Sequence, residues 1–507
     1  MKCFLMYRDR DFVLTKDAIE NGRELIKDLE LQILFQSMAG GDMFLRGVAE
    51  GAIVASLEDA SDVTYRQRVL MDCLDQPGIA KEMYGVAVEA LERERKVWGW
   101  LASKNPESVL YRSVEVLQVL LEPLGRLRAL AEGSQERFAS EGFTRFVGRI
   151  KGELCPEVLQ SIHQHLKTLS FHHGFVVSAG LGRGNRANAF IVERPPTAHG
   201  SWLNWLRGWL DELLGGGHET RIYSIDERDE SGFRALSELK GRALTSLAAV
   251  LARSAENVHA FFASLRLELG FYLGCVNLRD ELARTQGTFC FPVPVEGMPQ
   301  AFSAAGIYDI CLLLSGCVKV IGNDLNADSK NLVMITGANK GGKSTFLRSV
   351  GIAQLMMQAG MFVPADSLRL SMCHHLFTHF RREEDPRLEH GKFDEELSRM
   401  SSIIDRMTAA DVILFNESFA STNQREGAEI AGGVIKALLD SGIRVFYVTH
   451  LVDLVREFHQ QNDGDTLFLS AQRLPDGRRT FRLEQAEPES TSHAADLYSR
   501  VFESTSC

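Results

Sequence analysis

The chain has 507 residues, which is long enough for several domains and a large buried core. The hydrophobic share of 45% and the charged share of 24% are ordinary for a soluble globular protein, and no apolar run reaches the ~18 residues of a membrane span. The formal net charge of −11 excludes a surface coated in positive charge, so any contact with nucleic acid must come from a local basic patch.

The nine cysteines are scattered, odd in number and free of any C-x-x-C pair. This pattern favours reduced thiols in a cytoplasm over a disulfide framework or a zinc site. The N-terminus, Met1–Arg10, has no long apolar stretch, so a signal peptide is not expected. We therefore predict a cytoplasmic protein that does not engage a membrane.

The N-terminal third of the chain has a helical pattern. Leu25, Leu29 and Ile33 repeat every four residues, and the charge run Glu92–Lys96 is typical of a solvated helix face. These features predict a mostly helical core domain over residues 1–170.

Residues 171–229 have a different character and are predicted to form a small α+β insertion. Short strands are expected at Gly174–Val177 and Phe190–Val192. The glycine-rich segment Gly180–Asn185 between them is predicted to be a hairpin turn and not a dinucleotide loop, because no helix opens after it. An aromatic stripe in the insertion favours core packing over the gripping of a partner or a membrane surface. The stripe consists of Trp202, Trp205 and Trp209.

A long amphipathic helix is predicted from Glu230 to Leu282, because apolar residues keep a three-four rhythm along it. At the usual ~1.5 Å rise per residue such a helix would form a lever tens of ångströms long. The glycine- and proline-rich segment Thr285–Gln300 is typical of a hinge. We therefore expect a lever helix over residues 230–285 and a separate domain over residues 286–507.

The strongest motif lies at Gly337–Ser344, where the sequence GANKGGKS fits the pattern G-x-x-x-x-G-K-[ST] in full. It follows an apolar strand, Leu332–Ile335, and precedes a helix expected over Phe346–Ala359. In such a loop the backbone N–H groups point at phosphate oxygens, Lys343 would reach the β- and γ-phosphates, and the Ser344 hydroxyl would hold Mg²⁺. The predicted ATP-binding residues here are Gly337, Ala338, Asn339, Lys340, Gly341, Gly342, Lys343, Ser344 and Thr345.

A second element completes this chemistry. The apolar strand Val412–Phe415 ends in Asn416 and Glu417. In phosphate-loop ATPases an acidic residue at this place contacts the Mg²⁺ shell, and a following Glu polarises the attacking water. Glu417 is therefore a predicted catalytic residue. Asn416 is a predicted metal ligand that brings no charge, which indicates weaker Mg²⁺ affinity or slow turnover.

A third strand, Val445–Val448, ends in Thr449 and His450. A histidine at the carboxyl end of a strand in such a sheet can sense the γ-phosphate or contact the base. We therefore include His450 with Lys343 and Glu417 among the predicted catalytic residues.

Several of these stretches resemble the MutS family of DNA mismatch-repair proteins. The phosphate loop resembles the loop of that family, although Ala338 and Lys340 stand where Pro and Met are common. The resemblance implies an α/β phosphate-loop ATPase domain of the ABC type, which uses ATP and Mg²⁺, behind a helical core and lever region. It also implies roles in nucleotide binding for Asn323 and Gln354. The similar stretches are Gly322–Asp324, Thr336–Arg348, Gln354–Ala365, Asn416–Thr422 and Val448–His450.

The N-terminal half is a weaker match, at Asp28–Glu30 and Tyr65–Gln67. The architecture of the family implies a DNA-embracing homodimer whose two composite ATP sites drive lever arms, with repair or recombination proteins as further partners. Two departures stand out. The N-terminal half has no Phe-x-Glu triplet like the wedge of the mismatch-reading domain, and no room is expected for that domain before Leu25. Gly391 replaces the Ser that acts across the dimer. Glu396, three residues after Phe393, matches the family.

The leading hypothesis is ATP binding and slow hydrolysis, coupled through helical levers to binding of mismatched, damaged or branched DNA. The alternative is an ATP-gated dimeric scaffold that recruits protein partners without reading mismatches. The acidic net charge of −11, the stripe that begins at Trp202 and Asn416 favour it. A small-molecule phosphotransferase has little support, because no acceptor-binding lid is evident.

Overall fold

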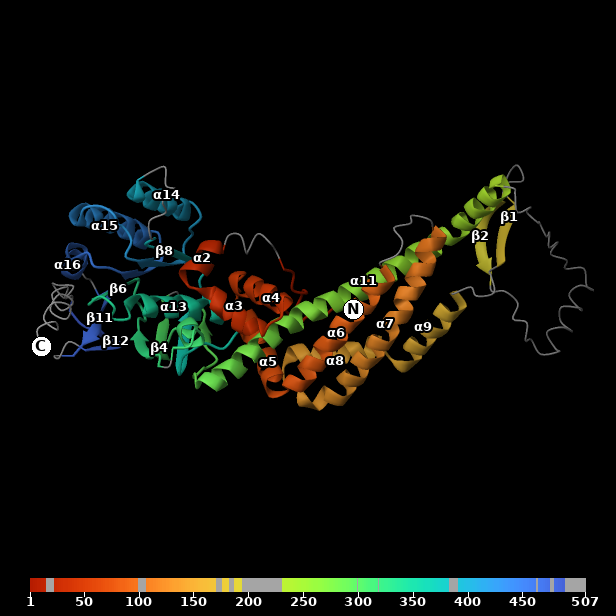
Figure 1. Cartoon of the computed structure of the whole chain (residues 1–507), viewed down its shortest axis with the longest axis horizontal. Coiled ribbons are helices and arrows are strands. Elements are labelled where there is room, and N and C mark those ends of the chain that lie inside the picture. The colour runs from red at the N-terminus through yellow and green to blue at the C-terminus, as the bar shows by residue number, and fades with distance from the viewer. Residues whose placement is uncertain are drawn as a thin grey trace, which may run out of the picture. The chain divides into compact units, whose positions relative to one another are not determined.

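The computed structural model describes residues 1–14, 22–98, 106–169, 176–181, 187–193, 230–298, 300–317, 319–382, 391–461, 464–474 and 478–487 (Figure 1). The chain divides into two compact units. The first contains Met1–Cys3, Glu82–Glu136 and Phe146–Arg266, and the second contains Phe4–Lys81, Arg137–Arg145 and Leu267–Cys507. The division falls inside helix α11, Glu230–Thr285, which occupies the segment where the sequence predicts a long helix.

The first unit is mainly helical. It contains most of α6 (Pro77–Trp98) and α8 (Glu141–Glu153), together with α7 (Pro106–Ser134) and α9 (Pro156–Leu169). Its core joins α7, α9 and the first part of α11, and α7 and α9 lie side by side in Figure 1. The buried residues of this core are Leu110, Val114, Leu166, Leu244 and Ala248.

A two-stranded antiparallel hairpin lies between α9 and α11 in the sequence. Its strands are β1 (Val176–Leu181) and β2 (Ala187–Glu193), close to the positions predicted for two short strands. The turn between them and the predicted tryptophan stripe lie outside the described residues.

The second unit begins with four helices, α2 (Arg23–Asp28), α3 (Leu31–Ala39), α4 (Met43–Val54) and α5 (Ala60–Asp75). The last two start at aspartates that cap them, because Asp42 accepts a hydrogen bond from the Phe44 amide at 2.7 Å and Asp59 accepts one from the Ser61 amide at 2.6 Å. None of the described helices combines the length and the apolar character that crossing a bilayer requires.

A six-stranded sheet forms the centre of the second unit, with strand order β12-β11-β6-β10-β9-β8. All its neighbours are parallel except β12, which pairs antiparallel with β11. Consecutive carboxyl ends of parallel strands therefore meet at one edge of the sheet. The strands are β6 (Leu332–Gly337), β8 (Leu376–Phe380), β9 (Val412–Asn416), β10 (Arg444–Val448), β11 (Thr466–Arg473) and β12 (Arg479–Gln485).

Helices cover both faces of this sheet (Figure 1). One face packs against α14 (Lys392–Ile404), α15 (Gln424–Asp440) and α16 (Val452–Gln460) through a single apolar cluster. The other face carries α13 (Lys343–Gln358), where a Cβ atom on Gly351 would lie 2.7 Å from Leu414. Successive side chains of a strand point to opposite faces of the sheet, and both faces are covered by helices. This explains why β6, β9 and β10 are continuous apolar runs.

A smaller, four-stranded sheet has the order β3-β7-β4-β5 and lies in the same unit. Its strands are β3 (Val293–Val295), β4 (Phe302–Ile307), β5 (Asn323–Asn326) and β7 (Ser367–Ser371), and the short helix α12 (Ile310–Leu314) follows β4.

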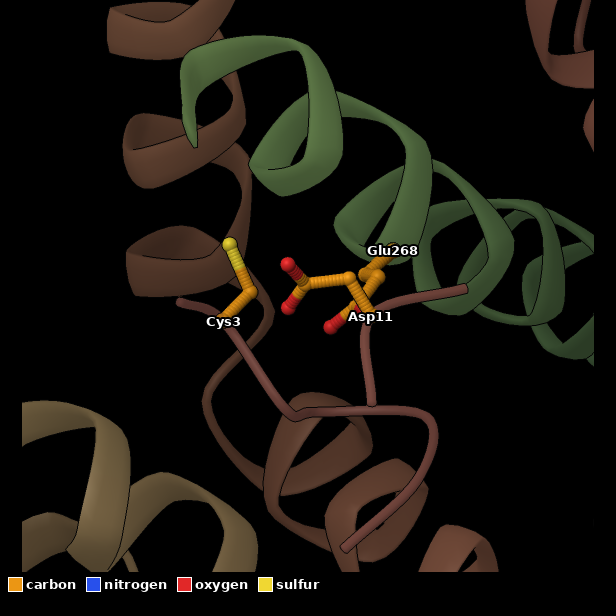
Figure 2. A group of neighbouring side chains, drawn as sticks. All are labelled: Cys3, Asp11 and Glu268. Carbon is orange, nitrogen blue, oxygen red and sulfur yellow. The ribbon is translucent and has the colours of Figure 1, made fainter. Parts of the chain in front are cut away.

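The N-terminal segment is held to α11 by a buried carboxylate. Glu268 accepts hydrogen bonds from the backbone N–H groups of Leu5 and Phe12, both at 2.7 Å. Figure 2 shows Glu268 on α11 beside the segment that carries Asp11. Burial raises the pKa of Glu268 to about 7.

Replacing Glu268 with alanine should lower the free energy of unfolding by about 2–4 kcal/mol, because each buried donor that loses its acceptor costs roughly 1–3 kcal/mol. Urea denaturation at pH 8, above the pKa of this carboxyl, would measure the loss. Glu281→Ala on the same helix is the control, since that residue forms an ion pair with the exposed Arg284 and is itself partly exposed. Equal stabilities of the two variants would contradict the anchoring role of Glu268.

Candidate nucleotide site

The loop from Gly337 to Gly342 connects β6 to α13 and requires glycine at its two ends. The backbone dihedral φ is 106° at Gly337 and 94° at Gly342, in the left-handed region that other residues rarely adopt. A Cβ atom on Gly337 would also lie 2.7 Å from the backbone nitrogen of Ala471 on β11. The glycines therefore allow a tight turn at the carboxyl end of β6, directly before the N-terminus of a helix.

Lys343 is the first residue of α13, and its side chain lies inside the loop. Its ammonium group donates hydrogen bonds to the carbonyl oxygens of Gly337 at 2.9 Å and Ala338 at 3.0 Å, and the residue is only 5% exposed. Burial lowers the pKa of Lys343 to about 8, and the nearby Glu417 partly opposes that shift. A lysine in this position presents its charge to the inside of the loop.

Ser344, in the first turn of α13, and Asn416, at the end of β9, meet at the edge of the sheet. The Ser344 hydroxyl donates a hydrogen bond to the side-chain oxygen of Asn416 at 2.8 Å. Both predicted metal ligands are therefore brought together. Two oxygen donors at this spacing suit Mg²⁺, which prefers oxygen ligands, but neither oxygen carries a charge.

Glu417 lies beside a histidine and two basic side chains. Its carboxylate accepts a hydrogen bond from His450 Nε2 at 3.1 Å and lies 3.7 Å from the Arg381 guanidinium. The pKa of Glu417 is lowered, first by the hydrogen bond with His450 and then by the charges of His450, Lys343 and Arg381. An ionised carboxylate next to the loop can accept a proton from a water molecule.

The backbone around Glu417 is strained, and hydrogen bonds to buried groups stabilise it. φ is 55° at Glu417 and 61° at Phe419, and both values lie in the left-handed region. The Phe419 amide donates to the carboxylate of Glu396 on α14 at 2.6 Å, and the Ser418 hydroxyl is 2.7 Å from His379 Nδ1. Burial lowers the pKa of His379 to about 4, so this histidine is neutral. The support fixes the direction of the Glu417 side chain.

Asn323 contacts the loop only through another strand. Its side-chain oxygen accepts from the Leu483 amide at 2.7 Å, and its amide nitrogen donates to the Phe481 carbonyl at 3.3 Å. Phe481 in turn lies 3.6 Å from the place of a Cβ atom on Gly342. Asn323 therefore positions β12 beside the loop.

Gln354 does not come near the loop. It lies three turns into α13, about 15 Å from Ser344 along the helix axis at the usual rise per residue. Its side chain is buried and donates to Gln358 at 2.5 Å and to the Ser371 carbonyl at 3.1 Å. These bonds connect α13 to β7, and we leave Gln354 out of the site proposed below. Ala338, Asn339, Lys340 and Gly341 lie within the loop, and Thr345 lies in the first turn of α13.

Residues that sequence reasoning missed include Arg381, His379 and Ser418. The strand β8 contains His379 and ends just before Arg381, and it was not among the predicted strands. A polar pair such as Arg381–Arg382 directly after a short apolar run was the signal that could have identified this edge. Gly391, which stands at the place of the family's trans-acting Ser, is the residue before the first turn of α14.

The fold is thus a mostly helical N-terminal region joined to an α/β domain with a mixed sheet, and its parallel strand ends gather polar residues at one edge. Comparison with protein-family models identifies the family to which this arrangement belongs. The model described as the MutS2 N-terminal domain matches residues 58–285, and the model described as MutS domain V matches residues 333–494. Together they cover more than half of the chain. The chain belongs to the MutS family.

Individual relatives match between about a quarter and a third of the chain. The chain is 30% identical over 184 residues to a DNA mismatch repair protein MutS of Chloroflexus aurantiacus, which covers 33% of this chain and 19% of the relative. It is 31% identical over 179 residues to the MutS of Porphyromonas gingivalis (34% and 20%), and 35% identical over 133 residues to that of Thermotoga maritima (26% and 17%). The matched region spans about a fifth of the length of these relatives.

Proposed function

We propose that this protein binds and hydrolyses ATP at the edge of the six-stranded sheet. The proposal rests on one observation: the ends of β6, β9 and β10 bring Lys343, the Ser344–Asn416 pair and the Glu417–His450 pair together next to a glycine loop and a helix N-terminus. This is the set of groups that phosphoryl transfer needs, because positioning and charge stabilisation supply most of the catalysis.

In the proposed ground state the loop amides and Lys343 hold the β- and γ-phosphates. Ser344 and Asn416 would hold Mg²⁺, which when bound neutralises phosphate charge and fixes the phosphate oxygens. Hydrolysis follows when a water oxygen forms a bond to the γ-phosphorus. The bond to the bridging oxygen breaks with its electron pair leaving on ADP, and the proton of the water passes to Glu417 and then to solvent.

The neutral Asn416 leads to a quantitative prediction. Asn416→Asp should lower the Mg²⁺ concentration for half-maximal ATP turnover by about tenfold, because a unit charge a few ångströms from the ion adds on the order of 1–2 kcal/mol of attraction. Phosphate release measured against Mg²⁺ concentration would test it. Asn423→Asp is the matched control, since Asn423 caps α15 and Asp caps equally well. An unaltered Mg²⁺ dependence would show that the missing charge does not limit turnover.

We further propose that ATP binding is coupled to DNA binding, as the family relationship suggests. The proposed route is a chain of buried contacts in the second unit. Arg66 donates to the carbonyl of Ala359 after α13 at 3.1 Å and to the carbonyl of Met6 at 3.3 Å. The segment around Met6 is held by Glu268 and Tyr272 of α11. A shift of α13 would therefore move α11 through these contacts. In the proposed homodimer with composite ATP sites, α11 acts as the lever.

DNA retention by the purified protein tests this function. Filter binding on homoduplex, mismatched and branched DNA, with and without ATP and across a range of salt, should show ATP-dependent binding to at least one substrate. The absence of any preference for DNA over an acidic competitor would exclude the DNA-binding role.

The alternative is an ATP-gated dimer that recruits repair or recombination proteins and does not retain DNA. The net charge of −11 favours it, because DNA contacts require a local cationic surface. Partner capture that appears only with ATP, together with no DNA retention, would decide for this alternative.

A further inference from the structure

Arg381 extends the site from a fourth strand. It directly follows β8, which is parallel to β9 with Phe380 opposite Asn416. Its backbone amide donates to the Asn416 carbonyl at 2.9 Å. The side chain of Arg381 therefore starts at the same edge of the sheet as the side chains of Asn416 and Glu417.

The guanidinium of Arg381 is only loosely paired in this structure. Within the described part of the chain its ion pair is with Glu417 at 3.7 Å, and its side chain is 44% exposed. Glu417 also pairs with His450 at 3.1 Å. A half-exposed ion pair at that distance contributes little, generally below about 1 kcal/mol. The guanidinium can therefore turn toward another anion with little loss of free energy.

The expected position of the substrate places such an anion within reach. A general base lies about 3 Å from the water that it activates, and that water lies about 3–3.5 Å from the phosphorus it attacks. A guanidinium within 4 Å of Glu417 is thus next to the oxygens of the γ-phosphoryl group. The charge that develops there needs compensation beyond Lys343, whose ammonium group lies inside the loop, because Asn416 supplies no charge on the metal side.

The neighbouring Arg382 provides the contrast. Its guanidinium pairs with Glu24 of α2 and lies 3.9 Å from Glu395 of α14. Two carboxylates already hold it away from Glu417. Adjacent arginines at the end of one strand thus have different surroundings, and only Arg381 faces the catalytic carboxylate.

We propose that Arg381 is a catalytic residue that donates hydrogen bonds to the γ-phosphoryl oxygens in the transition state of ATP hydrolysis. The inference rests on the proposed ATPase function. It assigns to this chain an arginine that acts within its own subunit, supplied by β8. A planar guanidinium can contact two phosphoryl oxygens at once, which an ammonium cannot do.

The test compares Arg381→Ala, Arg381→Lys and Arg382→Ala in the full chain. Three quantities are measured: kcat for phosphate release, affinity for a non-hydrolysable ATP analogue, and affinity for ADP with aluminium fluoride, which mimics the phosphoryl group in transfer. For Arg381→Ala we expect kcat to fall by about 10²-fold or more, the ADP–aluminium fluoride affinity to fall in parallel, and the analogue affinity to change less than about threefold. Arg381→Lys should recover part of kcat, and Arg382→Ala should stay within about threefold of the parent.

Three outcomes would overturn the inference: an unchanged kcat in Arg381→Ala, a raised kcat, which would mean that the arginine restrains Glu417, or a loss of kcat without loss of ADP–aluminium fluoride affinity. Should Arg381→Ala not fold, as judged by circular dichroism, Arg381→Gln replaces it. If the parent chain hydrolyses ATP and Arg381→Ala has the same kcat, the inference is refuted and the proposed function stands. A parent chain that neither binds nor hydrolyses ATP refutes the proposed function as well.

Discussion

Replacing Lys343 with alanine is expected to lower the affinity for ATP by more than about 100-fold. The ammonium of Lys343 lies inside the loop and is held there by two carbonyl oxygens. In the complex it would face phosphate oxygens in a site shielded from water, where truncating one member of a charged pair costs about 2–5 kcal/mol. Titration with a fluorescent ATP analogue would measure the loss.

The control for this prediction is Lys436→Ala. That lysine lies on α15 and pairs with Glu457, so its removal should leave nucleotide affinity within about threefold of the parent. Equal affinities of the parent and Lys343→Ala would show that the loop does not hold phosphate, and the proposed function would fail with it.

Replacing Glu417 with glutamine is expected to lower kcat by about 10²–10⁴-fold while ATP affinity stays near that of the parent. Glutamine retains the shape of the side chain and an oxygen that can accept from His450, but it cannot take a proton from the attacking water. Single-turnover phosphate release, together with nucleotide titration, separates the two effects.

Glu426→Gln is the matched control for this second prediction, because Glu426 lies in the first turn of α15 and its exposed carboxylate accepts a hydrogen bond from the Thr422 hydroxyl. It should keep the turnover of the parent. Hydrolysis at the parent rate in Glu417→Gln would mean that another group activates the water.

The parts of the site that follow from local sequence patterns could be predicted. The strand–loop–helix order around Gly337–Ser344 is confirmed by β6 and α13, and the strands expected before Asn416 and His450 are confirmed by β9 and β10. Apolar runs and glycine spacing depend only on nearby residues, and carboxyl ends of parallel strands meet by topology.

The parts that depend on register and packing could not be predicted. Arg381 reaches Glu417 only because β8 pairs with β9 in one particular register. Gln354 was expected near the nucleotide from a resemblance in sequence, but its place on α13 turns its side chain into the core. Asn323 acts through β12, a strand more than 150 residues later in the chain, and no pattern in the sequence connects the two.

The strained turn at Glu417 affects what fraction of the molecules can be active at a given moment. Left-handed backbone at two non-glycine residues costs roughly 1–3 kcal/mol each, and buried hydrogen bonds offset that cost, among them the bond from Phe419 to Glu396 on α14. Moving α14 would break the bond to Glu396 and lower the free-energy difference that favours the aligned turn over a relaxed one. Each change of about 1.4 kcal/mol in this free-energy difference alters the ratio of aligned to relaxed molecules about tenfold. The fraction of molecules that are ready for catalysis therefore depends on the position of α14.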